Sequence, residues 1–246
     1  NIQKGVKMKT LKFISSRLNK NCLYALCLSI VFIITGCAPS FPEFQGADLV
    51  GKGKMKATPY FTSTSSDEEE FDGELQSSLG VILAYGLTDS YDGHIKYESI
   101  KGEGGLVDGS IISLGIKFKL YSIGNHRISG YLPLSYSTRN LKSFDFFDES
   151  EESNNESLNY QTIEPTLLVS SNLFDKLDLN YSAKMIFKIG GDDTGEDDSG
   201  FAFNFSLSIP IPNLPNLILI PEYGILNVGE DSFNHSGVGF AWEFNN

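Results

Sequence analysis

The sequence predicts an all-β protein, namely an up-and-down antiparallel β-barrel of about ten strands. Beyond residue 50, apolar and polar residues alternate with a period of two, which is typical of strands that have one wet and one apolar face. The connections between these segments are short and long in turn, as a meander with two different ends would have them. The length of 246 residues suits one barrel domain.

The alternation is clearest in the second half of the chain. In 177–189, apolar residues from Leu177 to Ile189 share one face, and polar residues such as Asn180 and Lys184 share the other. The segment 201–209 repeats this pattern with phenylalanines. Counting such segments along the chain predicts strands over 50–62, 74–86, 91–101, 110–121, 127–138, 158–170, 177–189, 201–210, 217–226 and 236–245.

The connections indicate that the two ends of the barrel differ. Those in even positions are short turns, at 87–90, 122–126, 171–176 and 211–216. Those in odd positions are longer, polar and mostly acidic, and contain 65–70, 101–105, 147–156, 190–198 and 227–234. In an up-and-down meander, all odd connections lie at one end and all even connections at the other. One end is therefore expected to carry long acidic loops and the other only short turns.

The first 36 residues have the features of a secretory signal peptide. They hold six basic residues and no acidic one, followed by an apolar run over 22–34. This run is shorter than the roughly 20 residues that a membrane-spanning helix needs. Met8 is the expected start of translation. The sequence thus predicts a leader over 1–36, a linker over 37–49 and a barrel domain over 50–246.

The leader ends in Ile34-Thr-Gly-Cys37, which resembles the bacterial lipobox. This resemblance implies that Cys37 becomes the lipidated first residue of the mature chain. The alternatives are an ordinary signal peptide followed by a chance cysteine, or an uncleaved anchor. Cleavage removes the other two cysteines, so that neither a disulfide nor a cysteine-ligated metal site remains. It also leaves 13 of the 19 basic residues against 31 acidic ones, a formal charge of −18, which argues against nucleic acid as a partner.

Alternation alone does not say which face of the barrel is wet, because soluble and membrane barrels share the pattern with the faces exchanged. Small residues mixed with charges of both signs suit a crowded lumen. The last strand, Gly237–Phe244, resembles the aromatic-ended final strand of bacterial outer-membrane barrels, although two asparagines follow it. Aromatic residues near strand ends would form the interfacial girdles of such a barrel: Tyr60 or Phe61, Tyr85, Tyr91, Tyr97, Tyr136, Phe187, Phe201, Tyr223 and Trp242.

In a membrane barrel the polar face lines the lumen, where charges of opposite sign must pair. The expected structural network comprises Asp92, His94, Lys96, Glu98, Lys117, Glu164, Lys184 and Glu222. No cofactor and no catalytic group is predicted. No metal site is predicted either, since the acidic stretch 192–198 lacks the spacing of a calcium-binding EF-hand loop. The expected partners are membrane lipid and, through divalent cations bridging the acidic loops, lipopolysaccharide.

Three functions compete. The first is a barrel in the outer membrane of a Gram-negative bacterium, lipid-anchored at Cys37, with a structural or surface-interaction role through acidic external loops. The second is a soluble lipid-anchored periplasmic barrel that binds an apolar ligand among Leu179, Phe203 and Phe205. The third, an outer-membrane hydrolase, is disfavoured because the adjacent His235 and Ser236 point to opposite faces of a strand.

Sidedness follows from the positions of the connections. A lipidated N-terminus is expected on the periplasmic side, so the first strand would run outward. The loops around Glu69, Glu103, Glu151, Glu196 and Glu230 would then face the cell exterior, and the short turns would stay inside with the C-terminal Asn246.

Overall fold

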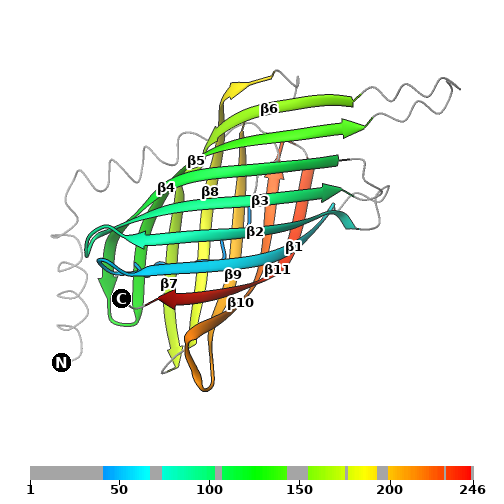
Figure 1. Ribbon diagram of the computed structural model, residues 1–246. Helices are drawn as coiled ribbons and strands as arrows, with labels where there is room; N and C mark the ends of the chain where they lie inside the picture. Colours follow the sequence, from blue (N-terminus) through cyan, green and yellow to red (C-terminus); the bar gives the residue numbers. More distant parts are fainter. Residues whose placement is uncertain are drawn as a thin grey trace, which may run out of the picture. The chain divides into compact units, whose positions relative to one another are not determined.

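The computed structural model describes residues 41–66, 74–102, 107–142, 155–174, 177–192, 199–229 and 231–244 (Figure 1). The expected leader over 1–36 and Cys37 lie outside the described residues. So do the acidic positions Glu69, Glu103, Glu151, Glu196 and Glu230. Within the described ranges, no helix is long and apolar enough to cross a membrane.

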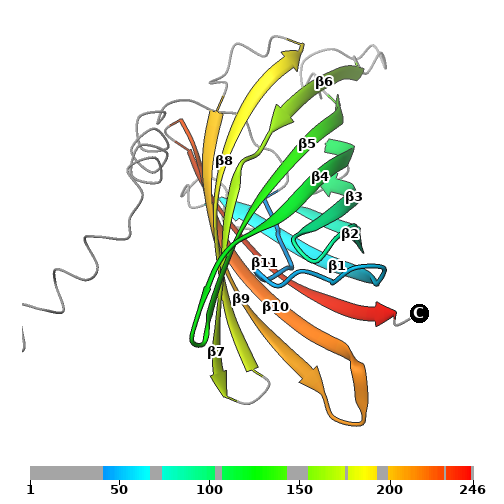
Figure 2. The ribbon, with the colours of Figure 1, turned by 90° about the vertical axis from the view of Figure 1, so that its left-hand side faces the viewer.

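The described residues form one antiparallel sheet that closes on itself (Figures 1 and 2). Strands that follow one another in the chain pair, and the first pairs with the last to close the ring. The exception is the sixth and seventh strands, which both pair with the fifth and the eighth but not with each other. The strands are β1 (Met55–Ser66), β2 (Glu74–Gly86), β3 (Tyr91–Gly102), β4 (Val107–Ile123), β5 (His126–Lys142), β6 (Asn155–Ile163), β7 (Thr166–Phe174), β8 (Leu177–Gly191), β9 (Ser199–Ile211), β10 (Leu214–Val228) and β11 (Asp231–Phe244).

The sixth expected strand is divided into β6 and β7 at Glu164 and Pro165. Proline has no amide hydrogen to donate to a sheet, so the regular ladder is interrupted there. The barrel wall nevertheless stays continuous, because the Glu164 amide donates to the Pro133 carbonyl at 3.1 Å and the Pro165 carbonyl accepts from the Met185 amide at 3.0 Å. With β6 and β7 as halves of one strand, the described residues make a ten-stranded barrel. This confirms the predicted all-β, up-and-down fold.

The strand directions define two ends. We call the end where β1 finishes and β2 begins the loop end, since the longest connections, 67–73, 143–154 and 192–198, leave from it. The expected long connection over 227–234 is wrong, because β10 and β11 stay paired as far as Val228 and Asp231 and only residues 229 and 230 join them. The opposite end, where β2 finishes and β3 begins, is the turn end. It carries the short connections, such as the one around the glycine at 124, whose φ is +54°.

The outer face of the barrel is apolar and the inner face is polar. Leu79 is 65% exposed and Trp242 54% exposed, whereas the neighbouring inward residue Ser78 is buried. Most of the expected girdle aromatics are exposed on the outer face, and Phe61, not Tyr60, is the member from β1. An outward apolar belt of this kind is typical of membrane barrels.

The soluble alternative is wrong on this geometry. Phe205 is 40% exposed on the outer wall, and Phe203 and Leu179 occupy the same outward face of the alternating pattern. The side chains that were expected to line an apolar cavity therefore do not face the interior. The interior instead receives the polar half of each strand.

The N-terminal part of the domain differs from the expectation. Residues 50–54 do not belong to the first strand, which begins only at Met55. Gly51 and Gly53 have φ of +89° and +77°, a conformation that glycine adopts without steric cost, and they turn the chain at the turn end beside Gly86. The described part of the expected linker, 41–49, is more than a connection, because it is packed inside the barrel.

Candidate functional site

The lumen of the barrel is occupied by the protein's own chain. We call residues 41–50 the luminal segment. Phe41, Glu43, Phe44, Gln45 and Ala47 are each at most 5% exposed, although they belong to no strand. A buried chain with no sheet partner must find other partners for its amides and carbonyls. Polar side chains of the barrel wall supply them at almost every position.

At the loop end, the segment begins in an apolar contact. Phe41 packs with Ile186, Ala202 and Leu226, which lie toward the loop end of β8, β9 and β10. The Asn204 side-chain amide donates to the Phe41 carbonyl at 2.9 Å. The Phe41 ring also meets the His235 ring edge-on, with the ring centroids 4.7 Å apart.

In the middle of the lumen, the carboxylate of Glu222 binds the backbone of the segment. One oxygen accepts from the Glu43 amide and the other from the Phe44 amide, both at 2.7 Å. The first oxygen also lies 3.2 Å from His235 Nε2. Hydrogen bonds to an ionised group contribute about 1.5–3 kcal/mol each when they form inside a protein. Glu222 is therefore a principal anchor of the segment.

A second anchor is an ion triad of one cation and two carboxylates. Lys184 on β8 contacts Glu43 of the segment and lies 3.3 Å from Glu164 at the β6–β7 junction. All three side chains are almost fully buried. Gln45 donates to the other oxygen of Glu43 at 2.8 Å, so both carboxylate oxygens have partners.

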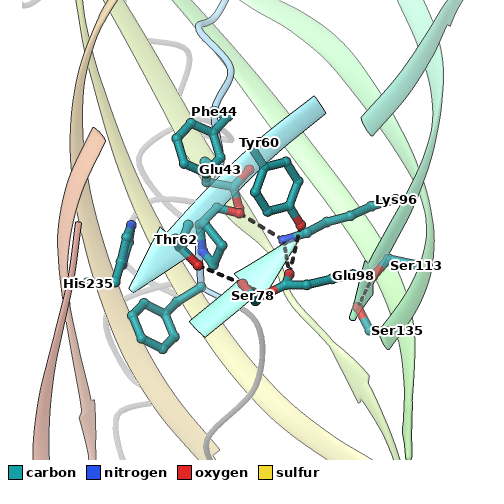
Figure 3. Close-up of polar contacts among 12 residues, drawn as sticks. Glu43, Phe44, Tyr60, Thr62, Ser78, Lys96, Glu98, Ser113, Ser135 and His235 are labelled. Carbon is teal, nitrogen blue, oxygen red and sulfur yellow. Dashed lines mark hydrogen bonds and ion pairs between the residues drawn. The ribbon is translucent and has the colours of Figure 1, made fainter. Parts of the chain in front are cut away.

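The third anchor lies on β3 and β1. Lys96 donates to the Pro42 carbonyl at 2.9 Å and pairs with Glu98 at 3.3 Å. Glu98 in turn accepts from the Tyr60 hydroxyl at 2.8 Å. The Tyr60 ring stacks on Phe44 with ring centroids 4.8 Å apart, so an aromatic side chain of the segment has an aromatic platform within a polar lumen (Figure 3).

Toward the turn end, Lys117 on β4 holds three oxygens of the segment. Its ammonium donates to the Asp48 carbonyl at 2.6 Å, to the Gly46 carbonyl at 3.2 Å and to Gln45 Oε1 at 3.4 Å. Asp92 on β3 accepts from the Val50 amide at 2.7 Å. Because Lys117 binds two backbone carbonyls and one side-chain oxygen of the same segment, it holds that segment in one register.

Two hydroxyls and one arginine complete the turn end. The Ala47 amide donates to Ser170 Oγ at 2.7 Å, and its carbonyl accepts from Ser129. Arg127 bridges two acids, with Nε 2.9 Å from Asp48 and Nη2 2.8 Å from Asp178. The segment is thus bonded to strands on all sides of the lumen.

The eight side chains of the expected luminal network are all buried. Five of them contact the luminal segment directly, and Glu98 and Glu164 reach it through the lysines that they pair with. His94 stands apart: in the described residues neither ring nitrogen has a hydrogen-bond partner, and its ring lies 5.2 Å from the Tyr131 ring. The direct members are Asp92, Lys96, Lys117, Lys184 and Glu222.

Sequence reasoning missed the segment itself and the uncharged residues that bind it. Glu43 and Asp48 belong to the expected linker, and His235, which the expected network omits, is buried against Glu222. One signal was available: 41–50 contains Phe41, Phe44 and Val50, more apolar character than an exposed linker needs. The serines and Asn204 gave no signal, because polar residues on alternating strands are unremarkable.

The arrangement can hold a peptide, but it offers no obvious chemistry. Among the described residues, no group of three or more His, Cys, Asp and Glu side chains is placed to hold a metal ion. The His235–Glu222 pair is closed to solvent, and Glu222 is already bonded to two amides. The geometry is that of a receptor for the chain's own N-terminal segment.

No protein-family model matches the sequence, and no curated protein matches it. Among solved structures, the chain is similar to an outer membrane channel from Pseudomonas putida F1, with a TM-score of 0.50 and 13% identity over 84% of this chain and 100% of that one. It is also similar to the translocator domain of the autotransporter NalP from Neisseria meningitidis, with a TM-score of 0.48 and 12% identity over 79% and 89%. For the outer membrane protease OmpT from Escherichia coli the values are 0.40 and 9% over 78% and 97%. The fold is thus that of the bacterial outer-membrane β-barrels, which confirms the resemblance inferred from the strands.

Proposed function

We propose that this protein is a lipid-anchored barrel of the outer membrane of a Gram-negative bacterium, and that its role is structural or surface-interacting. In this proposal, Cys37 carries the lipid, the acidic long connections face the exterior, and the lumen conducts no solute. The apolar outer belt supports the membrane location. The observation that supports a closed lumen is the luminal segment, which binds the inward charges of the wall.

A conduit would need inward groups that are free to exchange with water or solute. Here Lys117, Lys184 and Glu222 are buried and bonded to the segment. Removing one partner from such a pair leaves an uncompensated buried charge, so the arrangement resists spontaneous opening. The proposal therefore assigns the interaction role to the outer surface rather than to the interior.

The hydrolase alternative finds no support in this lumen. His235, the histidine next to Ser236, is buried and bonded to Glu222. Membrane lipid is the first proposed partner, and the apolar outer belt supports it. Divalent cations between acidic connections and lipopolysaccharide phosphates are the second proposed partner, on the strength of the 31 acidic residues in the chain.

Fatty-acid labelling tests the anchor. The wild-type protein should incorporate a fatty-acid probe, and Cys37→Ser should not, because the proposed attachment atom is gone. Cys27→Ser is the matched control, since it changes a cysteine inside the leader and should label like wild type. Equal labelling of Cys37→Ser and wild type would contradict lipidation at this residue.

Fractionation of the same Cys37→Ser protein, exported with a cleavable leader, tests the barrel. It should stay in the outer-membrane fraction and migrate differently on a gel before and after heating, as folded membrane barrels do. Recovery from the periplasmic supernatant would contradict a membrane barrel while leaving the lipidation result unaffected.

A further inference from the structure

The partners of the luminal segment follow a spatial order along the barrel axis. Phe41 contacts residues next to the loop end, among them Ala202 and Val228. Phe44 lies at mid-height, against Tyr60 and the Glu222 carboxylate. The later residues contact the first residues of strands that start at the turn end, β3 and β5. The segment therefore runs from the loop end to the turn end.

The last three contacts fix the direction. Asp48 pairs with Arg127, the second residue of β5, and with Asp178 through that arginine. The Val50 amide binds Asp92, the second residue of β3. Lys52 forms an isolated β-bridge with Gly86, the last residue of β2. Each of these residues lies at the turn end, where the chain turns back to begin β1.

The length of the segment agrees with a full crossing. Nine peptide units separate Phe41 from Val50, so the segment spans at most about 30 Å, and less where it departs from the extended conformation, as at Phe44, whose φ is +42°. The apolar band of an outer-membrane barrel is about 25 Å tall. The luminal segment thus spans the membrane inside the barrel, and the chain crosses the bilayer once before β1 crosses it again.

We infer that the N-terminal segment threads the barrel, so that the residues before Phe41, Cys37 included, emerge on the same side of the membrane as the long acidic connections. This reverses the sidedness expected from the sequence, in which the N-terminus and the long connections lay on opposite sides. Cys37 precedes Phe41 by four residues and reaches at most about 14 Å from it. It cannot return to the turn end, which is a membrane thickness away.

A consequence follows for the lipid, and it rests on the lipidation proposed above. The acyl chains on Cys37 would enter the leaflet at the loop end, beside the acidic connections. If those connections face the exterior, the protein is a surface-exposed lipoprotein whose anchor and interacting loops share one face. Its lipid, its loops and the lipopolysaccharide headgroups would then meet in one layer.

The chemistry of the lumen supports this direction of threading over the reverse. In the observed direction, Asp48 meets Arg127, Glu43 meets Lys184, and Phe41 meets an apolar cluster. A segment inserted the other way would place the Phe41 ring among the charged groups of the turn end and Asp48 in the apolar cluster. Burying an unpaired carboxylate among apolar side chains is strongly unfavourable.

Single-cysteine labelling on intact cells tests the inference. The probe positions are Ser40→Cys before the segment, Thr194→Cys in a long connection and Asn125→Cys in a short turn, each treated with a membrane-impermeant maleimide before and after permeabilisation. We expect Ser40→Cys to react in the same condition as Thr194→Cys, and Asn125→Cys to react in the other. Reaction of Ser40→Cys together with Asn125→Cys would overturn the inference.

A second variant keeps the test decisive if a thiol at position 40 is too shielded to react. A hydrophilic epitope inserted between Pro39 and Ser40 should bind antibody in the same condition as an epitope inserted at Thr194, and binding together with an epitope at Asn125 would overturn the inference.

The outcome also separates this inference from the proposed function. Reaction at positions 40 and 194 only after permeabilisation supports threading but contradicts external loops, and labelling of the wild-type chain itself would show an unlipidated Cys37.

Discussion

Lys184→Met should lower the free energy of unfolding of the barrel by about 3–5 kcal/mol, the cost of breaking a buried ion pair by removing one partner. Lys184 is the cation between Glu43 of the luminal segment and Glu164 of the wall. Methionine fills a similar volume but leaves two buried carboxylates facing each other. Both carboxylates are then buried without a cation, and their mutual repulsion lowers the stability of the folded protein.

The change is measured in detergent as the urea concentration at which half of the protein is unfolded, the midpoint. The folded barrel is recognised by its gel mobility, which changes on heating. Lys101→Met is the matched control, because Lys101 is exposed on β3 and its replacement should leave the midpoint nearly unchanged. The triple variant Lys184→Met, Glu43→Gln, Glu164→Gln should recover most of the loss, since it removes both orphaned charges together. Equal midpoints for Lys184→Met and wild type would mean that the triad does not stabilise the barrel.

The strands were predictable because their signal is local. Side chains of a strand alternate between its faces, so each wall segment shows its period of two without reference to any other. All ten expected strands are present, and most extend a few residues further than the alternation indicated. The break at Pro165 was not predicted, and proline alone does not mark it, because Pro59, Pro133 and Pro221 lie inside β1, β5 and β10 without dividing them. The polarity of the two faces followed from composition, and Tyr60 was the ambiguous girdle position.

The luminal segment was not predictable in the same way, because its structure is set by partners far away in the chain. Phe44 binds Glu222, 178 residues away, and the Asn204 partner of Phe41 is 163 residues away. A peptide that belongs to no sheet shows no periodic alternation of polar and apolar residues in its sequence. The network around it was therefore anticipated as charges that neutralise one another. Its actual role, to hold a peptide in one register and one direction, depends on the tertiary structure.

The close approach of this segment to the wall also explains two glycines. A Cβ at Gly237 would lie 2.8 Å from the Phe44 ring and 2.5 Å from the Phe61 carbonyl. A Cβ at Gly46 would lie 2.5 Å from Asn180 Oδ1 and 2.6 Å from Ser170 Oγ. One glycine is in the wall and the other in the segment, so both partners have been fitted to a narrow gap. Such a fit indicates a permanent occupant of the lumen.

Replacing residues 41–50 by a Gly/Ser chain of the same length should open the lumen to ions. The replacement has no carboxylate for Lys184, no side-chain amide for Lys117 and no ring for Tyr60. It would also lose more conformational entropy on ordering than the native segment does. Water should then enter to solvate the inward charges, because buried charges without partners are far more costly than hydrated ones. The wild-type protein should show no conductance steps in a planar bilayer, and the replaced protein should show them.

The control is the double substitution Lys52→Ser, Lys54→Ser, which alters exposed residues just beyond the segment and should leave the bilayer silent. The gel shift on heating establishes that each protein is folded before conductance is recorded. A folded but silent replacement would show that the wall side chains close the lumen by themselves. Conductance of the wild type would show that the segment leaves the lumen spontaneously. Since the segment bonds through Glu222, Lys184, Lys96 and Lys117 at once, its departure must break all four anchors together, and we expect closure to be the resting state of this barrel.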